Sequence, residues 1–146
     1  MKRSRLLLDT HIVLWLDTGD EALRPETRGL LDDHWRSGGT HCISAITAWE
    51  IALLADLGRI ELDVAPAAWL TRFLARPGLE PVALTTAAAT QAYPLAGLAQ
   101  RDPADRLLIA TAIELGCPLV TYDERILEYA ARHGAAIGFE ALAQRA

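Results

Sequence analysis

Short apolar runs alternate along this chain with longer segments in which apolar residues recur at helical spacing. Leu6–Leu8 and Leu119–Thr121 are runs of strand length, and an aspartate follows each of them closely. Such short apolar runs are typical of strands buried on both faces of a parallel sheet. Two more strands are expected at Thr40–Ile43 and Pro81–Leu84, and a final edge strand at Ala135–Phe139.

The segments between these strands predict helices, because their apolar residues follow one another at intervals of three and four. Ser44 is a favourable N-cap, and Pro25 and Pro66 suit the first turns of two other helices. The expected helices span residues 10–16, 25–36, 44–57, 66–74, 86–93, 102–115 and 126–132. The four tryptophans fit core positions on them: Trp15, Trp35, Trp49 and Trp69. Alternating strands and helices predict an α/β fold with a parallel sheet covered on both faces.

The helix that begins near residue 102 has the clearest start signal in the chain. Asp102 is a good N-cap, Pro103 fits the first helical position, and Gly116 follows the last turn. Asp105 falls in the first turn, near the positive end of the helix dipole. The helix is therefore expected to pack its apolar residues into the core and to place two carboxylates at its N-terminus.

Three more acidic residues stand where they can join this pair. Asp9 and Asp123 follow buried strands, and Glu50 lies inside an apolar helix. Taken alone, each acidic residue has an ordinary explanation as a cap, a turn residue or a solvated helix position. Sites in parallel α/β sheets form beyond the carboxyl ends of the strands, so we expect the group to converge. Gathered carboxylates need a compensating cation, and oxygen ligands favour Mg²⁺ or Mn²⁺.

A divalent ion that keeps some of its waters is suited to hydrolysing phosphodiesters by metal-activated water. Arg101, Arg106 and Arg125 are close to the acidic residues in sequence and are candidates for holding the phosphate. Surface ion pairs are the ordinary alternative for these three arginines. His11 follows the Asp9 segment directly, and a packing or supporting role is favoured over that of a general base.

Composition narrows the class of protein. The 146 residues suffice for a single domain, expected to span 1–146, and the net charge of −5 argues against coating of nucleic acid through bulk charge. Cys42 and Cys117 lie in apolar runs, which predicts buried thiols, and the scattered histidines argue against zinc. The first apolar run is too short for a signal peptide or a membrane span, so a cytoplasmic protein is expected.

Three blocks of the chain resemble one known family. They are residues 7–15, residues 44–52 with 58–60, and residues 102–110 with 119–123. In order and spacing they resemble PIN-domain ribonucleases, in particular the VapC-type toxins of bacterial toxin–antitoxin pairs. The chain departs from the usual pattern at Gln100 and Ala104, where the family often has His and Phe, and at Leu54, where Lys is frequent. These departures affect RNA binding and partner docking, and none of them is an acidic position.

The resemblance implies a three-layer α/β/α fold with a mainly parallel, five-stranded sheet. It implies an Mg²⁺- or Mn²⁺-dependent endoribonuclease, a cognate VapB-type antitoxin as partner, and a homodimer. It maps the catalytic and metal-binding acidic residues onto Asp9, Glu50, Asp105 and Asp123. It implies an accessory role for Asp102 and supporting roles for the hydroxyls of Thr10 and Thr121. The apolar faces of helices 25–36 and 44–57 are candidates for a groove that binds the antitoxin.

Two other readings stay open: a different metal-dependent phosphohydrolase, and a PIN-like binding module without catalysis. A receiver domain needs a lysine late in the chain, but Lys2 is the only lysine. A haloacid-dehalogenase-like phosphatase needs an aspartate two residues after Asp9, where this chain has His11. Intact acidic positions argue against the binding module.

Overall fold

A five-stranded parallel sheet lies at the centre of the computed structural model, which describes residues 4–95, 98 and 102–143. The strands are β1 Arg5–Leu8, β2 Thr40–Ser44, β3 Leu79–Val82, β4 Leu119–Val120 and β5 Ala141–Leu142. Their order across the sheet is β3-β2-β1-β4-β5, and each neighbouring pair is parallel. The predicted α/β class with a parallel sheet is confirmed.

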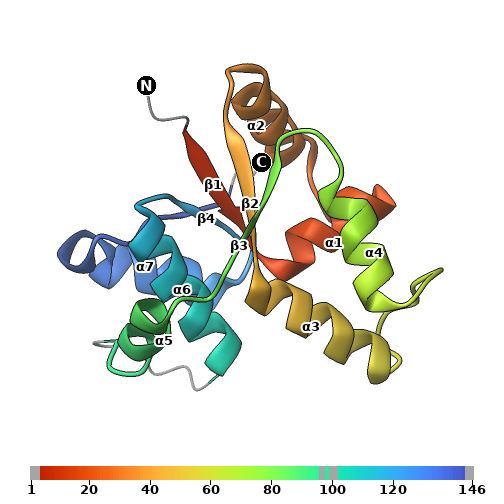
Figure 1. The fold of residues 1–146 in the computed structure, drawn as a ribbon. Helices are drawn as coiled ribbons and strands as arrows, with labels where there is room; N and C mark the ends of the chain where they lie inside the picture. The colour runs from red at the N-terminus through yellow and green to blue at the C-terminus, as the bar shows by residue number, and fades with distance from the viewer. Residues whose placement is uncertain (1–3, 96–97, 99–101, 144–146) are drawn as a thin grey trace.

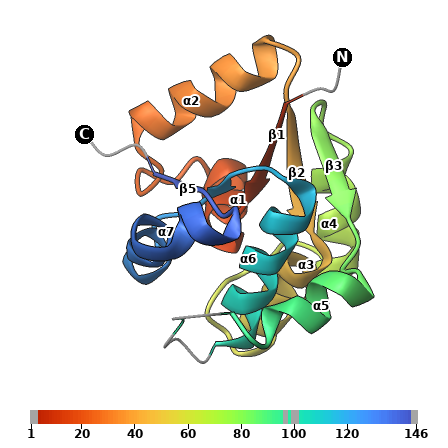
Figure 2. The ribbon, with the colours of Figure 1, turned by 90° about the vertical axis from the view of Figure 1, so that its left-hand side faces the viewer.

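Helices cover both faces of this sheet, which gives the three layers that the resemblance implies. They are α1 Thr10–Thr18, α2 Pro25–Arg36, α3 Ala45–Asp56, α4 Pro66–Leu74, α5 Thr86–Ala92, α6 Pro103–Leu115 and α7 Glu124–Ile137. Figure 1 shows α1, α3 and α4 on one side of the strands and α5, α6 and α7 on the other. Figure 2 shows α2 standing apart, at the end of the sheet where β1 begins.

The side chains of β1 alternate between two hydrophobic cores, as expected for a strand buried on both faces. Leu7 packs with Leu108 and Ile109 of α6 in one core. Leu6 and Leu8 belong to the other core, which lies on the side of α1, α3 and α4. All three leucines are 5% exposed or less, so β1 is the innermost strand, and it places Asp9 at its carboxyl end.

The strongest sequence signals correspond to real helix ends. The Asp102 side chain caps α6 by accepting the backbone N–H of Ala104 at 3.0 Å, and Pro103 occupies the first turn. Gly116 ends the helix with φ at 65°, a left-handed conformation that glycine adopts without steric cost. The predicted boundaries of α6 are thus confirmed.

The prediction for the end of the chain was wrong. Ala135–Phe139 was expected to be an edge strand, but α7 continues to Ile137 and the last strand is β5. Gly138, with φ at 73°, ends the helix, and the N–H of Phe139 donates to the carbonyl of Gly134. The third strand is also displaced, since β3 begins two residues before the predicted Pro81.

Two tryptophans lie outside the core, against expectation. Trp49 is 59% exposed because α3 turns Ile46, Thr47 and Ile51 inward, which leaves Trp49 on the other side. Trp35 is 47% exposed and lies over the backbone of Gly78 at the end of α2. Trp69, in contrast, is buried and stacks on Phe73.

Both cysteines are buried, as predicted, and burial raises the pKa of the Cys42 thiol to about 12. In the described part of the chain, no helix is long and apolar enough to cross a membrane.

Candidate metal centre

Four separate segments bring the predicted acidic residues to the carboxyl edge of the sheet. Asp9 lies between β1 and α1, and Asp123 lies between β4 and α7. Glu50 comes from the middle of α3, and Asp105 from the first turn of α6. Asp102 lies one turn before Asp105, at the N-cap of α6. Neighbouring parallel strands end side by side, so the topology itself brings these segments together.

One hydrogen-bonded chain connects Asp9 with Glu50. The backbone N–H of Thr10 donates to Asp9 Oδ1 at 2.7 Å, and the Thr10 hydroxyl donates to Glu50 Oε1 at 2.6 Å. Thr10 is buried, and so is Thr47, whose hydroxyl lies 3.2 Å from that of Thr10. The structure thus brings α3 and the end of β1 together through a threonine.

A second series of hydrogen bonds connects Asp9 with Asp123. The Thr121 hydroxyl donates to Asp9 Oδ2 at 2.7 Å and accepts the backbone N–H of Asp123 at 3.0 Å. Thr121 is fully buried and directly follows β4. Since Thr10 donates to one oxygen of Asp9 and Thr121 donates to the other, hydrogen bonds fix the carboxylate of Asp9 from two sides.

Burial and the charges of the other carboxylates raise the pKa of Asp105. Asp105 is 8% exposed, and this burial raises the pKa of its carboxyl to about 7, with Asp102, Asp9, Asp123 and Glu50 contributing further. Burial also raises the pKa of Glu50, although the hydrogen bond from Thr10 opposes the rise. The five carboxylates therefore lie close enough for their charges to raise the pKa of Asp105 and of Glu50, so that ionising all of them at once is unfavourable without a cation.

Helix N-termini supply part of the missing positive charge. Asp9, Asp102 and Asp123 each cap a helix, namely α1, α6 and α7, by accepting a backbone N–H. The exposed N–H groups of a first helical turn stabilise nearby anions. The ordinary explanation of these three residues as caps is therefore correct, and it holds together with their convergence. Burial is the main cause of the raised pKa of Asp105, and the neighbouring carboxylates raise it further.

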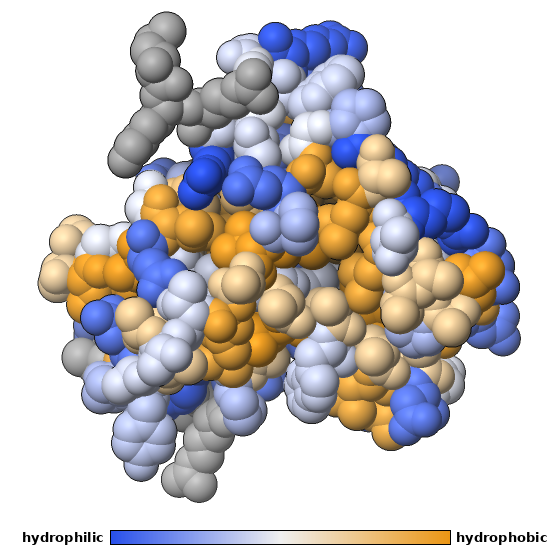
Figure 3. Space-filling model, viewed as in Figure 1, coloured by the Kyte–Doolittle hydropathy of each residue, from blue (hydrophilic) through white to orange (hydrophobic). Residues whose placement is uncertain are grey.

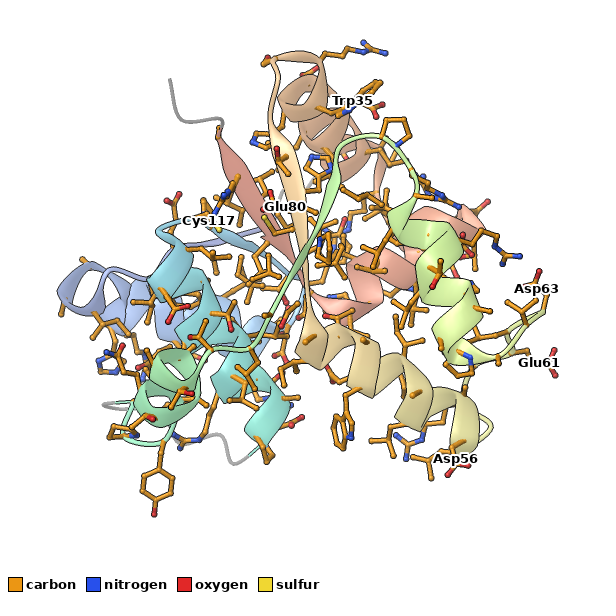
Figure 4. All side chains as sticks on the ribbon, in the orientation of Figure 1. Trp35, Asp56, Glu61, Asp63, Glu80 and Cys117 are labelled. Carbon is orange, nitrogen blue, oxygen red and sulfur yellow. The ribbon has the colours of Figure 1, made fainter. Side chains whose placement is uncertain are left out.

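The chemistry of the donor set fits a hard divalent cation. Carboxylate oxygens are the ligands that Mg²⁺ and Mn²⁺ prefer, and a cation would reverse the unfavourable field at Asp105. Within residues 4–95, 98 and 102–143, no three Asp, Glu, His or Cys side chains lie together in a group that could hold a metal ion. Other acidic residues lie elsewhere: Figure 4 shows Asp56 at the outer end of α3, and Glu61 and Asp63 in the connection between α3 and α4.

The three candidate arginines have different surroundings. The guanidinium of Arg106 donates to the carbonyl oxygens of Tyr93 at 3.0 Å and Leu98 at 2.9 Å, so it braces the connection before α6. Arg106 thus has a structural role, and the expectation that it also holds a phosphate stays a prediction. Arg125 is exposed, and its Nε lies 3.7 Å from Asp123 Oδ1. Arg101 lies outside the described residues, as does Gln100.

Sequence reasoning missed Thr47 and Tyr122. Thr47 lies one helical turn before Glu50 on an otherwise apolar helix, and this spacing was the available signal. The Tyr122 hydroxyl bonds to the Thr27 hydroxyl and accepts the backbone N–H of Arg24 at 3.1 Å. Because Tyr122 precedes Asp123, it ties α2 to the edge of the site, and no sequence pattern indicated this contact.

A parallel α/β domain with carboxylates collected beyond β1 and β4 is also the architecture of a known family. Residues 6–132 match the PIN domain, and the chain belongs to the PIN-domain family. Within it the chain is of the VapC type: it is 32% identical over 121 residues to Ribonuclease VapC22 of Mycobacterium tuberculosis, covering 83% of this chain and 88% of that protein.

Solved structures share the fold. VapBC2 from Rickettsia felis, bound to a DNA fragment from their promoter, is similar with a TM-score of 0.61 and 18% identity, covering 94% of this chain and 97% of that one. A toxin–antitoxin complex from Klebsiella pneumoniae is similar with a TM-score of 0.56 and 18% identity, covering 92% and 94% of the two chains. At this identity the likeness concerns the fold alone.

Proposed function

We propose that this protein is the toxin of a type II toxin–antitoxin pair, an endoribonuclease that hydrolyses RNA with Mg²⁺ or Mn²⁺. The observation that carries the proposal is the convergence of acidic side chains from four segments on one small region. Thr10 joins Asp9 to Glu50 through its backbone N–H and its hydroxyl, and the Thr121 hydroxyl joins Asp9 to the backbone of Asp123. The charges of these three carboxylates raise the pKa of Asp105 beyond the effect of burial. The name of the relative from M. tuberculosis, a ribonuclease, supports the reaction class.

The residues have distinct roles in this proposal. Asp9, Glu50 and Asp105 hold the ion directly or through water, while Asp123 completes the ring or helps to hold a second ion. When bound, the ion supplies an activated water and stabilises the charge that develops on the phosphate and the leaving oxygen. Asp102 is an accessory carboxylate that adds to the field at Asp105.

The remaining groups orient the carboxylates and the RNA. Thr10 and Thr121 hold the two oxygens of Asp9, which limits the rotation of its carboxylate. Arg125 lies exposed beside Asp123 and is suited to hold a phosphate of the RNA chain, and Arg101 stays a candidate for the same task.

The test is RNA cleavage by the wild type and by Asp9→Asn, with Mg²⁺, with Mn²⁺ and with EDTA. Loss of a ligand that acts in the transition state is expected to slow cleavage by about 100-fold or more, with an unchanged circular dichroism spectrum. Asp56→Asn is the matched control, since Asp56 is an exposed carboxylate at the far end of α3. Cleavage that persists in EDTA or in Asp9→Asn rejects the proposal. A wild type that neither binds Mn²⁺ nor cleaves RNA favours the non-catalytic module.

A cognate VapB-type antitoxin is the proposed partner, but its surface differs from the one first expected. Figures 1 and 2 show α2 and α3 at different ends of the molecule, so they do not form one groove. The α3 helix and its C-cap instead expose Trp49, Leu53 and Leu57, spaced by four residues. Figure 3 shows hydrophobic surface around α3 and α4. Such a stripe suits the apolar face of a partner segment.

Co-expression with the neighbouring small gene tests the partner. We expect a stable complex that no longer cleaves RNA, and we expect Leu53→Asp to weaken it while Val64→Asp, another exposed apolar position, does not. Recovery of the chain without a partner contradicts the proposal. Size-exclusion chromatography with light scattering of the isolated chain tests the homodimer that the family resemblance implies.

A further inference from the structure

His11 lies directly beside the candidate metal centre, and the sequence predicts for it only an unspecified packing or supporting role. It belongs to the first turn of α1, two residues after Asp9, and its side chain is 30% exposed. Its ring packs against Trp15, with centroids 5.0 Å apart, and lies 6.3 Å from the ring of Tyr122. The imidazole therefore fills the space between the end of β1 and the segment that follows β4.

The hydrogen bonds define which ring nitrogen carries the proton. The backbone N–H of Tyr122 donates to His11 Nε2 at 3.1 Å. A backbone N–H can only donate, so Nε2 acts as the acceptor and the proton of the neutral ring resides on Nδ1. Nδ1 lies 3.6 Å from Asp9 Oδ2, the oxygen that also accepts the Thr121 hydroxyl.

We propose that His11 is a positioning residue that holds the carboxylate of Asp9 for metal binding through its Nδ1–H. This inference rests on the proposed function, because it needs Asp9 to be a metal ligand. The separation of 3.6 Å is longer than a hydrogen bond, and an approach of about 0.5 Å brings Nδ1 into bonding range of Oδ2. The Tyr122 N–H anchors the opposite side of the ring, so the imidazole links β1 to β4 at the site.

The proposal also gives each oxygen of the Asp9 carboxylate a defined set of partners. A carboxylate offers about four lone-pair positions. Thr10 uses one on Oδ1, while Thr121 uses one on Oδ2, the oxygen that lies 3.6 Å from His11 Nδ1. The second lone pair of Oδ1 would then be available to a bound ion. A general base needs an available nitrogen lone pair, and the one on His11 is already engaged by Tyr122.

The tautomer is measured first, in the wild type without metal. Long-range ¹H–¹⁵N correlation spectra distinguish a protonated from an unprotonated ring nitrogen, and His11→Gln identifies which signals belong to His11. We expect a protonated Nδ1 and an unprotonated Nε2. The reverse tautomer overturns the proposal, because no N–H would then face Asp9.

Two substitutions separate positioning from packing. Asn places an amide near the position of Nδ1, whereas Gln reaches the position of Nε2 and leaves Asp9 without that donor. We expect His11→Gln to weaken Mn²⁺ binding about 10- to 100-fold by calorimetry, as other changes to groups that orient metal ligands do. We expect His11→Asn to stay close to the wild type in Mn²⁺ affinity and to lose thermal stability, since the acceptor for Tyr122 is gone. His133→Gln on α7 is the control and leaves the affinity unchanged.

Unchanged Mn²⁺ affinity in His11→Gln, or an equal loss in the Asn and Gln variants, overturns the positioning role. Asp9→Asn, measured in parallel, identifies which idea has failed. Wild-type affinity in Asp9→Asn means that the metal centre is wrong, and this overturns both proposals. Loss of binding in Asp9→Asn without loss in His11→Gln overturns only the role of His11.

Discussion

Among single residues, Thr121 has the most central position in the carboxylate region. It is fully buried, and its one hydroxyl both donates to Asp9 and accepts from the backbone of Asp123. A hydroxyl is the smallest group that can donate and accept at the same time. Thr121 therefore joins two acidic residues that come from different strands, and it does so without adding charge.

Thr121→Val keeps the shape of the side chain and removes both hydrogen bonds. We expect a loss of about 1–3 kcal/mol in the free energy of unfolding, because buried polar groups are left unsatisfied. Urea denaturation with EDTA measures it. Thr111→Val is the matched control: Thr111 is also buried, but its hydroxyl donates only to the carbonyl of Leu107 in its own helix, so the loss should be smaller. Equal losses in the two variants contradict this view of Thr121.

Asp105 is expected to lower the stability of the metal-free protein at neutral pH. Its folded-state pKa is raised from 3.8 to about 7, so the folded state holds the proton more tightly than the unfolded state does. The resulting destabilisation grows as the pH rises from 3.8 to about 7 and is constant above that range. Asp105→Asn removes the charge and should stabilise the protein by about 1–3 kcal/mol at pH 8 in EDTA, and by less at pH 5.

Urea denaturation at the two pH values checks this, with Asp33→Asn on the exposed face of α2 as the control. A destabilised Asp105→Asn at pH 8 would show that the carboxylate is well compensated without metal.

The sequence predicted which acidic residues converge, because strand ends and a helix start position Asp9, Asp123 and Asp105. It could not predict how their oxygens are held. Two of those bonds join side chains far apart in the sequence, Thr10 with Glu50 and Thr121 with Asp9, and they depend on the sheet order that brings these residues together. For the same reason the sequence could not predict that the guanidinium of Arg106 donates to the carbonyl oxygens of Tyr93 and Leu98.

Among the elements, α2 is joined to β2 by an unusual contact between two histidine rings. The ring of His34 on α2 stacks on that of His41 on β2, with centroids 5.2 Å apart and planes inclined by 17°. His41 is 8% exposed, and the Nε2 atom of its ring is buried without a hydrogen-bond partner among the described residues. Gly39 makes this stack possible, since a Cβ there would collide with the ring of His34.

The attachment of α2 should weaken in acid. Burial and the nearby His34 lower the pKa of His41 to about 4, although Asp32 and a hydrogen bond to Leu31 oppose the shift. The unfolded chain takes up this proton near pH 6.5, so stability is complete above pH 6.5 and is lost as the pH falls toward 4. We expect His41 to account for about 1–2 kcal/mol of the fall in unfolding free energy between pH 7 and pH 5.

His41→Gln should reduce that fall, and His133→Gln should leave it unchanged. Denaturation series at both pH values measure the difference. An identical fall in wild type and His41→Gln would mean that other groups cause the acid sensitivity.

Elements with strong end signals were predicted well, and those without them were not. Ser44, Asp102 and Gly116 fix the ends of α3 and α6 through local hydrogen bonds or a left-handed turn, which sequence alone reveals. The end of α7 depends on the capping turn at Gly138 and on Phe139, which packs in the core with Tyr129. The short strands β4 and β5 exist because β1 pairs with β4 and β4 with β5, so no local pattern could predict their lengths.

At the scale of the whole molecule, the fold concentrates negative charge where the proposed substrate must bind. The chain has a net charge of −5, and the parallel sheet directs its acidic strand ends and the N-termini of α1, α6 and α7 to one edge. RNA is itself a polyanion. Attraction must therefore come from a bound divalent ion and from the few arginines near the site, because the surface as a whole repels RNA.

This charge balance predicts weak RNA binding in EDTA that depends little on salt. For single strands, the logarithm of the binding constant falls by about 0.7 per logarithmic unit of salt for each phosphate neutralised. With one or two arginines in reach, the expected slope is about −1, and Arg125→Ala should make it shallower by about 0.7. Fluorescence anisotropy with a labelled single-stranded RNA in EDTA measures both slopes, since cleavage requires the ion under the proposed function. Tight binding with a steep slope would indicate a basic RNA surface, and the ion would then act in chemistry but not in binding.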